Sequence, residues 1–149
     1  LMCVLMACVL TLAAIIPPAG AADASSEVIW LEDLEWEWID LSAVEYDAAG
    51  PAPLTSVEVD KTVSAHSVGY FSSFMSFKAN DVVAFNCSYS PSSANMDFGV
   101  VSSTGKFHLI NVKGGSISQT IGINQAGSYA VAVRNNSSQT VRVVGFVNY

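Results

Sequence analysis

Few side chains of this 149-residue chain could carry out chemistry, and their spacing favours structural roles. Neither His66 nor His108 has a carboxylate and a nucleophile beside it in a catalytic motif. The sequence contains no Gly-x-Ser-x-Gly elbow and no His-Glu-x-x-His helix. A Ser-His-Asp arrangement is defined by geometry rather than by chain order, so a hydrolase that uses His66 or His108 with a serine stays open as an alternative. We predict that the protein is not an enzyme.

A reactive thiol, a metal site and a cofactor are not predicted either. Cys87 alternates with Phe85 and Tyr89, which places its thiol inside, where desolvation makes it inert. The weak candidates for a calcium site are Asp97 and Asp81, which are isolated in the sequence, whereas calcium takes six to eight oxygen ligands. We expect these two carboxylates to cap turns and to hydrogen-bond at strand ends.

Aromatic side chains are the best candidates for binding a ligand. The candidate residues are Trp30, Trp36, Trp38, Tyr70 and Phe74. Tyr70 and Phe74, like Phe146, alternate with predicted core residues, so each lies either on an outer face or in a second packing layer. A sandwich that binds carbohydrate commonly presents exposed aromatic platforms, so the expected partner is an extracellular protein or a glycan. Nucleic acid is not expected, because the six basic residues are scattered.

A body of short strands must position these residues. Apolar and polar residues alternate with a period of two, for example over 82–89, and turn residues separate the segments. The segments are 55–59, 68–78, 82–89, about 96–100, 107–112, about 117–123, about 129–134 and 140–148. This pattern predicts an all-β fold, a two-layer antiparallel β-sandwich of about eight strands, jelly-roll or PPC-like, over residues 55–149. Because His108 alternates with Phe107 and Leu109, we expect it to face solvent or a sheet edge.

An acidic arm and a Pro/Gly linker, residues 23–54, precede the body. Nine of the 13 acidic residues precede residue 48, whereas all six basic residues follow residue 55. Residues 34–40 alternate so that Leu34, Trp36 and Trp38 share one side, which is typical of a strand that could pair with an open sheet edge, its own or a neighbour's. A helix with a loose apolar face and a disordered acidic spacer are the alternatives.

Residues 1–22 predict export. The apolar run from Val4 to Ile16 is shorter than the roughly 20 residues that a membrane-spanning helix needs. Ala19-Gly20-Ala21 fits the A-x-A rule for signal peptidase, so we expect a cleaved signal peptide, no membrane attachment after cleavage, and a secreted protein. The chain opens on Leu1 without a basic region, which indicates a truncated gene start.

Three stretches of the body resemble the bacterial pre-peptidase C-terminal (PPC) domains. Residues 77–85, Phe-Lys-Ala-Asn-Asp-Val-Val-Ala-Phe, resemble the F-x-A-G-D-x-V-x-F corner of that family, with Asn80 in place of the glycine. Residues 97–105 resemble its aspartate-led strand and turn, and residues 127–133 are similar to its G-x-Y-x-V-x-V strand. The same order also resembles the GOLD sandwich. The resemblance implies a β-sandwich, but the acidic turn that can contribute to a metal site in the family is Ser103-Thr104-Gly105 here.

The whole chain further resembles small exported proteins of Gram-positive gut bacteria that end in Gly-Phe-Val-Asn-Tyr. Together these features predict a secreted, non-catalytic β-sandwich module that binds a protein or a glycan outside the cell. A self-assembling subunit, in which residues 28–40 pair with a neighbouring sheet edge, is the alternative of another class.

Overall fold

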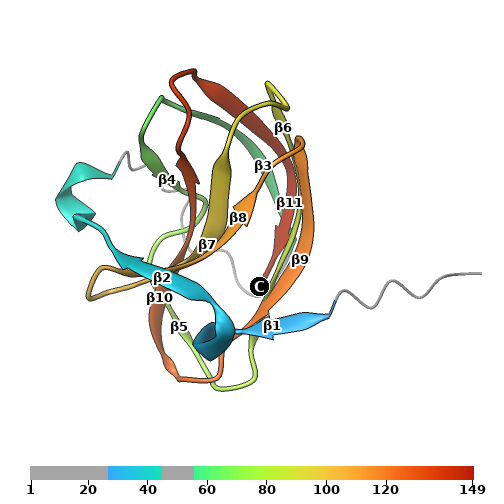
Figure 1. Cartoon of the computed structure of the whole chain (residues 1–149). Coiled ribbons are helices and arrows are strands. Elements are labelled where there is room, and N and C mark those ends of the chain that lie inside the picture. Colours follow the sequence, from blue (N-terminus) through green and yellow to red (C-terminus); the bar gives the residue numbers. More distant parts are fainter. Residues whose placement is uncertain (1–26, 45–55) are drawn as a thin grey trace, which may run out of the picture.

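The chain forms two stacked β-sheets (Figure 1). The computed structural model describes residues 27–44 and 56–149, and the predicted signal peptide (1–22) and linker (48–53) lie outside them. The strands are β1 (Val28–Trp30), β2 (Glu35–Trp38), β3 (Ser56–Val63), β4 (Val68–Tyr70), β5 (Met75–Phe77), β6 (Val82–Ser90), β7 (Met96–Ser102), β8 (Lys106–Val112), β9 (Ser116–Gly122), β10 (Gly127–Asn135) and β11 (Val141–Asn148). Two short 3₁₀ turns, η1 (Leu31–Asp33) and η2 (Leu41–Ala43), complete the described elements.

The strand order confirms the predicted all-β sandwich. The five-stranded sheet has the order β1-β9-β6-β11-β3, and the six-stranded sheet has the order β2-β8-β7-β10-β4, with β5 also paired to β10. The pairs within the two sheets are antiparallel, except that β1 runs parallel to β9. If β4 and β5 are counted as one interrupted strand, β3–β11 are the eight strands of a jelly roll.

The single strand predicted over 68–78 is wrong, because residues 71–74 interrupt it. The backbone N–H of Phe71 donates to the Val131 carbonyl at 2.8 Å, and the Ser72 hydroxyl then accepts from the Val131 N–H at 2.9 Å. A side chain thus takes the place of a ladder carbonyl at this point. The ladder with β10 therefore stops after Tyr70 and resumes at Met75.

The main core lies between the sheets and follows the predicted alternation. On β6, Val83, Phe85, Cys87 and Tyr89 all point into it, as predicted. Phe98 stands at its centre, with its ring centroid 5.9 Å from that of Phe85 and 6.1 Å from that of Tyr89. Burial of large apolar side chains in this layer is the main stabilising contribution to the fold.

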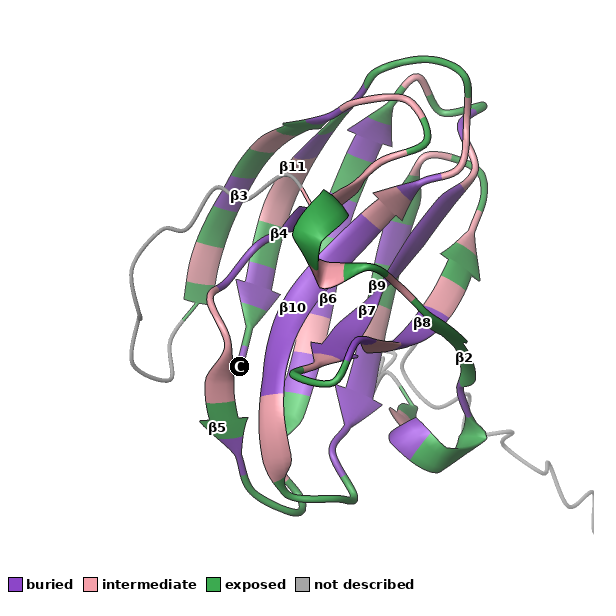
Figure 2. Cartoon of the chain, turned by 90° about the vertical axis from the view of Figure 1, so that its left-hand side faces the viewer, coloured by how far each residue is buried: buried purple, intermediate pink, exposed green. Residues whose placement is uncertain are grey.

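A second apolar cluster lies on the outer face of the six-stranded sheet. The outer cluster consists of Tyr70, Val101, Phe107, Leu109, Ala130 and Ala132. Ile39, Leu41 and Val44 of the N-terminal segment pack on it, together with Val68 and Phe74. Figure 2 shows η2 lying in front of this sheet. Strands β7 and β10 are therefore buried on both faces, unlike the strands of the opposite sheet.

Residues 27–44, which we call the arm, close one side of the sandwich. β1 adds to the edge of the five-stranded sheet beside β9, and β2 adds to the edge of the six-stranded sheet beside β8. Between them η1 crosses from one layer to the other, with Leu31 and Leu34 buried in the main core (Figure 1). The strand predicted over 34–40 is confirmed for Glu35–Trp38, and it pairs with an edge of its own chain.

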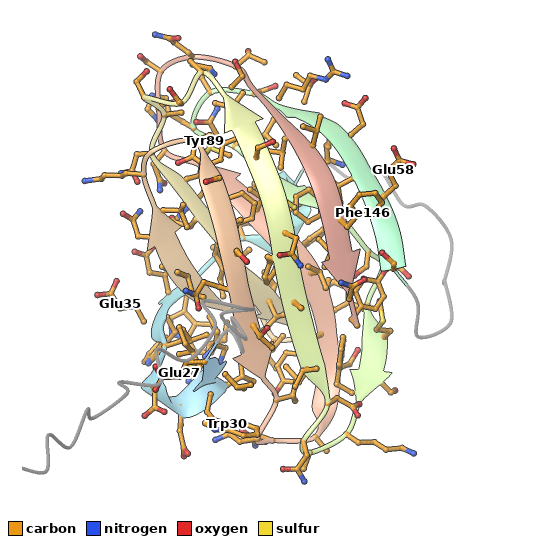
Figure 3. All side chains as sticks on the ribbon, turned by 90° about the vertical axis from the view of Figure 1, so that its right-hand side faces the viewer. Glu27, Trp30, Glu35, Glu58, Tyr89 and Phe146 are labelled. Carbon is orange, nitrogen blue, oxygen red and sulfur yellow. The ribbon has the colours of Figure 1, made fainter. Side chains whose placement is uncertain are left out.

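The outer face of the five-stranded sheet is bare and largely polar. Phe146 projects from β11 and is half exposed, and Asp60 holds Arg142 in an exposed ion pair with two hydrogen bonds, of 2.8 and 2.7 Å. Figure 3 looks onto this sheet, with Glu58 and the acidic Glu35 on opposite sides of the molecule. No helix within 27–44 and 56–149 is long and apolar enough to cross a membrane.

Candidate functional site

The five aromatic residues predicted to bind a ligand lie at three separate places. Tyr70 and Phe74 belong to the outer cluster, where their ring centroids lie 5.7 Å apart. Tyr70 is buried and Phe74 half-buried. These two residues therefore form the second packing layer, one of the two alternatives that their alternation left open, and they offer little surface to a ligand.

Trp30 lies on the outer face of the five-stranded sheet, where it covers Gly122. A Cβ atom on residue 122 would lie 2.4 Å from Cε3 of Trp30, so only glycine lets the indole lie this close to the strand. Ile29, the residue before it, packs on the main core from the opposite side of β1. Trp30 is half-buried and fixes β1 to β9.

Trp36 and Trp38 form a pair of exposed indoles, which we call the tryptophan pair. Their ring centroids are 5.9 Å apart in an edge-to-face arrangement, and 49% of Trp36 and 65% of Trp38 is exposed. In the register of β2 with β8, Trp36 lies opposite His108 and Trp38 opposite Lys106. Directly opposed residues share one face of a sheet, so the tryptophan pair stands on the same face as these two side chains.

A pocket adjoins the tryptophan pair at this end of the sandwich. It has a volume of about 430 Å³ and is lined by the arm, the β7–β8 turn, β8 and the β9–β10 loop. Its lining includes the side chains of Glu32, Lys106, His108 and Gln125. This volume lies within the range of small-molecule sites, about 300–1,000 Å³. The pocket and the tryptophan pair are contiguous, because Lys106 and His108 belong to both surroundings.

His108 was expected to face solvent or a sheet edge, and this prediction is wrong for its side chain. Only 9% of the residue is exposed, and its Nδ1 lies 3.1 Å from the Leu31 carbonyl oxygen. Phe107 and Leu109 take the outward positions instead, because the outer cluster buries them. The alternation was recognised correctly, but both faces of β8 are covered, so it could not distinguish inside from outside.

The environment of His108 fixes its protonation and its tautomer. Burial lowers its pKa below the ordinary 6.5, and the Lys106 charge lowers it further, against the opposing effect of the Leu31 carbonyl. A carbonyl oxygen only accepts hydrogen bonds, so Nδ1 carries the proton and Nε2 keeps a lone pair. Among the described residues, Nε2 has no hydrogen-bond partner.

The hydroxyl groups in the pocket are not arranged for nucleophilic catalysis. The Ser102 and Thr104 hydroxyls lie 2.8 Å apart and bond to one another, and Ser102 Oγ also accepts from the Lys106 backbone N–H. Within the part of the chain described, no hydrogen bond joins a histidine to a hydroxyl or to a carboxylate. A nucleophile needs such a base within about 3 Å, although apo geometry can be looser.

The predicted metal candidates do not converge. Asp97 is buried, and its two oxygens accept from Arg134 at 2.8 Å, Asn111 at 2.6 Å and Asn136 at 2.7 Å. Asp81 instead accepts from the backbone N–H of Lys78, which is a turn-capping bond. Across 27–44 and 56–149, no group of three or more His, Cys, Asp or Glu side chains could hold a metal ion.

Arg134 connects the arm to the sandwich through Asp97. Its Nη1 lies 2.6 Å from Glu37 Oε2 on β2, and its Nη2 lies 2.7 Å from Asp97 Oδ2 on β7. The guanidinium also sits over the ring of Phe107, at 5.7 Å. This network holds β2 in register and uses both oxygens of a buried carboxylate, so its role is structural.

Cys87 is buried as predicted. Desolvation raises the pKa of its thiol to about 11, and Sγ lies 3.6 Å from the Phe146 carbonyl oxygen. A thiol in this state is protonated at neutral pH and is a weak nucleophile.

Sequence reasoning missed most of the pocket. Glu32, Lys106 and Gln125 come from the arm, β8 and the β9–β10 loop, and no local spacing links them. The only available signal was the alternation of Leu34, Trp36 and Trp38, which identified the strand on which the exposed indoles lie. No family model, curated protein or solved structure matches the chain, so the resemblances to PPC and GOLD domains stay predictions.

Proposed function

We propose that the protein is a secreted, non-catalytic module that binds a glycan through the tryptophan pair and the adjoining pocket. The observation that carries the proposal is the exposure of two neighbouring indoles, 49% and 65%, beside a polar pocket. Large exposed aromatic side chains on a soluble protein mark interaction sites. An indole ring can stack on the C–H face of a sugar ring, while pocket amides and carboxylates bond its hydroxyls.

The polar lining favours a glycan over a protein segment. Gln125, Asn124 and Ser128 line the pocket beside Glu32, so it combines amide, hydroxyl and carboxylate groups in a concave site. A protein partner normally needs an apolar interface core of several hundred Å². The two indoles alone supply only part of such an area, since each covers at most about 250 Å².

Glycan binding is tested with the chain lacking residues 1–22, on a glycan array and then by calorimetry. We expect Trp36→Ala and Trp38→Ala each to weaken binding by at least about tenfold. Phe146→Ala is the matched control, because Phe146 is equally exposed but projects from the other sheet. The proposal fails if no glycan binds, or if the tryptophan variants bind as tightly as the parent protein.

Self-assembly is a second candidate, because β2 is the last strand of its sheet and its outer edge is unpaired within the described residues. The charged side chains of Glu35 and Glu37 on β2 oppose such pairing. Size-exclusion chromatography with light scattering separates the candidates. A protein that stays monomeric over a hundredfold range of concentration excludes assembly through β2.

A further inference from the structure

The arm, which carries the tryptophan pair, is strongly acidic, and Glu35 and Glu37 project from the face of β2 opposite to the two indoles. The arm carries six acidic residues and no basic residue: Glu27, Glu32, Asp33, Glu35, Glu37 and Asp40. Only Glu37 and Asp40 have hydrogen bonds or ion pairs to side chains in the described residues, to Arg134 and Ser42 respectively. Glu32 lines the pocket itself and is exposed. Summed charges of one sign attract a ligand of the opposite sign.

The protein already places a cation on the tryptophan pair. Lys106 Nζ lies 4.2 Å from the centroid of the Trp36 ring, over its face. An ammonium group in this position is attracted by the negative face of the indole. The same lysine also lines the pocket, where Glu32 and Lys106 are the two charged side chains.

The pocket also offers hydrogen-bond acceptors beside the Lys106 ammonium. His108, nine-tenths buried, donates a hydrogen bond from Nδ1–H to the Leu31 carbonyl oxygen, which leaves Nε2 as an acceptor. The Glu32 carboxylate is a further acceptor of the lining and carries a negative charge. A ligand group that donates several hydrogen bonds and carries positive charge satisfies both, and a primary ammonium has three N–H donors.

We infer that the glycan bound at the tryptophan pair and the pocket carries free, positively charged amino groups, as a polymer of hexosamine units does. This inference rests on the proposed function and specifies its ligand class. The sugar ring would stack on Trp38 and the free face of Trp36, and its ammonium group would lie in the pocket near Glu32 and His108. An N-acetylated amine loses the charge and two of its three N–H donors.

Three oligosaccharides that differ at one atom group test the inference. They are β-1,4-linked hexamers of glucosamine, N-acetylglucosamine and glucose, which carry an ammonium, an acetamide or a hydroxyl group at C2. We expect the glucosamine hexamer to bind about tenfold more tightly than the other two at low salt, as suits a charge-assisted contact. This preference should shrink as salt is added, because the carboxylates are exposed.

Two variants separate the inference from the proposed function. Glu32→Gln should abolish most of the preference for the glucosamine hexamer over the glucose hexamer, whatever its effect on the affinity for the glucose hexamer. Glu58→Gln is its control, since Glu58 is an exposed carboxylate on β3, away from the pocket (Figure 3). Trp36→Ala should weaken binding of every hexamer that the parent protein binds.

Equal affinity for the three hexamers overturns the inference and leaves the proposed function standing. If none of the three hexamers binds, and the tryptophan variants bind a glycan array as the parent protein does, both the inference and the proposed function are overturned. Hexalysine is the last probe. If it binds as tightly as the glucosamine hexamer and competes with it, the site recognises ammonium groups without a sugar, and the inference is overturned in favour of a basic protein segment.

Discussion

The outer faces of the two sheets carry similar residues in opposite environments. On the six-stranded sheet, Arg134 pairs with a buried Asp97 beside the fully buried Phe107. On the five-stranded sheet, an arginine–aspartate pair and a phenylalanine are exposed instead: Arg142, Asp60 and Phe146. Both sets point away from the main core along their strands. What distinguishes them is the arm, which covers one face and, apart from Trp30 over Gly122, leaves the other bare.

The comparison shows that strand alternation decides which way a side chain points but not whether it is buried. Ile39, Leu41 and Val44 lie far from β7, β8 and β10 in the sequence, yet they turn an outer face into an apolar layer. The same segment presents the tryptophan pair to solvent. One acidic segment therefore both covers the outer face of the six-stranded sheet and carries the tryptophan pair of the candidate binding site.

Removing the arm should have the largest effect, because it makes the two outer faces alike. A variant without residues 1–44 exposes the edges of β8 and β9 and uncovers Phe107 and Leu109. Burial of Leu31 and Leu34 alone contributes about 3–6 kcal/mol, a large part of the usual stability of a domain. We expect loss of most of the free energy of unfolding in urea titrations, with oligomers in light scattering. A stable monomer would show that the sandwich folds and stays monomeric without the arm.

Truncating one phenylalanine on each face should give the next largest contrast. Phe107→Ala should lower the free energy of unfolding by about 3–5 kcal/mol, because it opens a cavity under the arm. Phe146→Ala should lower it by less than about 1 kcal/mol, because half of Phe146 is already in water. Urea denaturation of the two variants measures the difference. Similar losses would mean that the arm does not pack on Phe107 in solution.

The two arginines provide a smaller contrast of the same kind. Arg134→Met leaves the buried Asp97 with only amide partners, Asn111 and Asn136, and should cost about 3 kcal/mol. Arg142→Met breaks an exposed pair and should leave the denaturation midpoint unchanged. A double variant, Arg134→Met with Asp97→Asn, should recover part of the loss. No recovery would assign the effect of Arg134 to its packing on Phe107 instead.

The smallest expected effect is the pH dependence of stability that comes from His108, which lies between the arm and the sandwich. Because burial lowers the pKa of His108 in the folded protein, the unfolded chain takes up the proton first as pH falls below about 6.5. The free energy of unfolding should therefore decrease from that pH downward, until the folded-state pKa is passed. Lys106 and Glu32 are the charged groups that line the same pocket.

Melting temperatures between pH 7.5 and 5.5 measure this dependence. His108→Gln should flatten the slope, whatever its effect on stability at neutral pH. His66→Asn should keep the parent slope, because His66 is exposed and asparagine tolerates its φ of 54°. A slope that His108→Gln does not change would assign the acid sensitivity to other groups.

The main core could be predicted from the sequence, and the outer cluster could not. The alternation of Val83, Phe85, Cys87 and Tyr89 was sufficient, because only one face of β6 is buried. In β10, Ala130 and Ala132 alternate with valines, and alanine is equally compatible with a buried and an exposed face. Their burial depends on β4 and on the arm. A signal was present, since residues 129–133 are apolar on both faces, which is typical of a strand covered twice.

The candidate site was predicted only in part for the same reason. Trp36 and Trp38 could be assigned to one side of a strand from their spacing, and they lie together in the structure. Tyr70 and Phe74 share the aromatic character but lie under other elements. The pocket depends on the register of β2 with β8, and a pairing between residues 35–38 and 106–109 is set by the fold rather than by local sequence.

The order of synthesis adds a consequence of the arm. β1 and β2 are made before the other strands of the two sheets. The partner of β1, strand β9, follows 92 residues later (Val28↔Thr120), and the partner of β2, strand β8, follows 68–74 residues later (Trp38↔Lys106 and Glu35↔Leu109). Contacts between residues this far apart in the chain form slowly, because the entropy of closing the long loop is lost before the strands gain any pairing energy. A nascent chain therefore carries an acidic segment whose pairing with the sandwich can be completed only after residue 122 has been added. Until then, the negative charges of this segment oppose its pairing with strands of other chains.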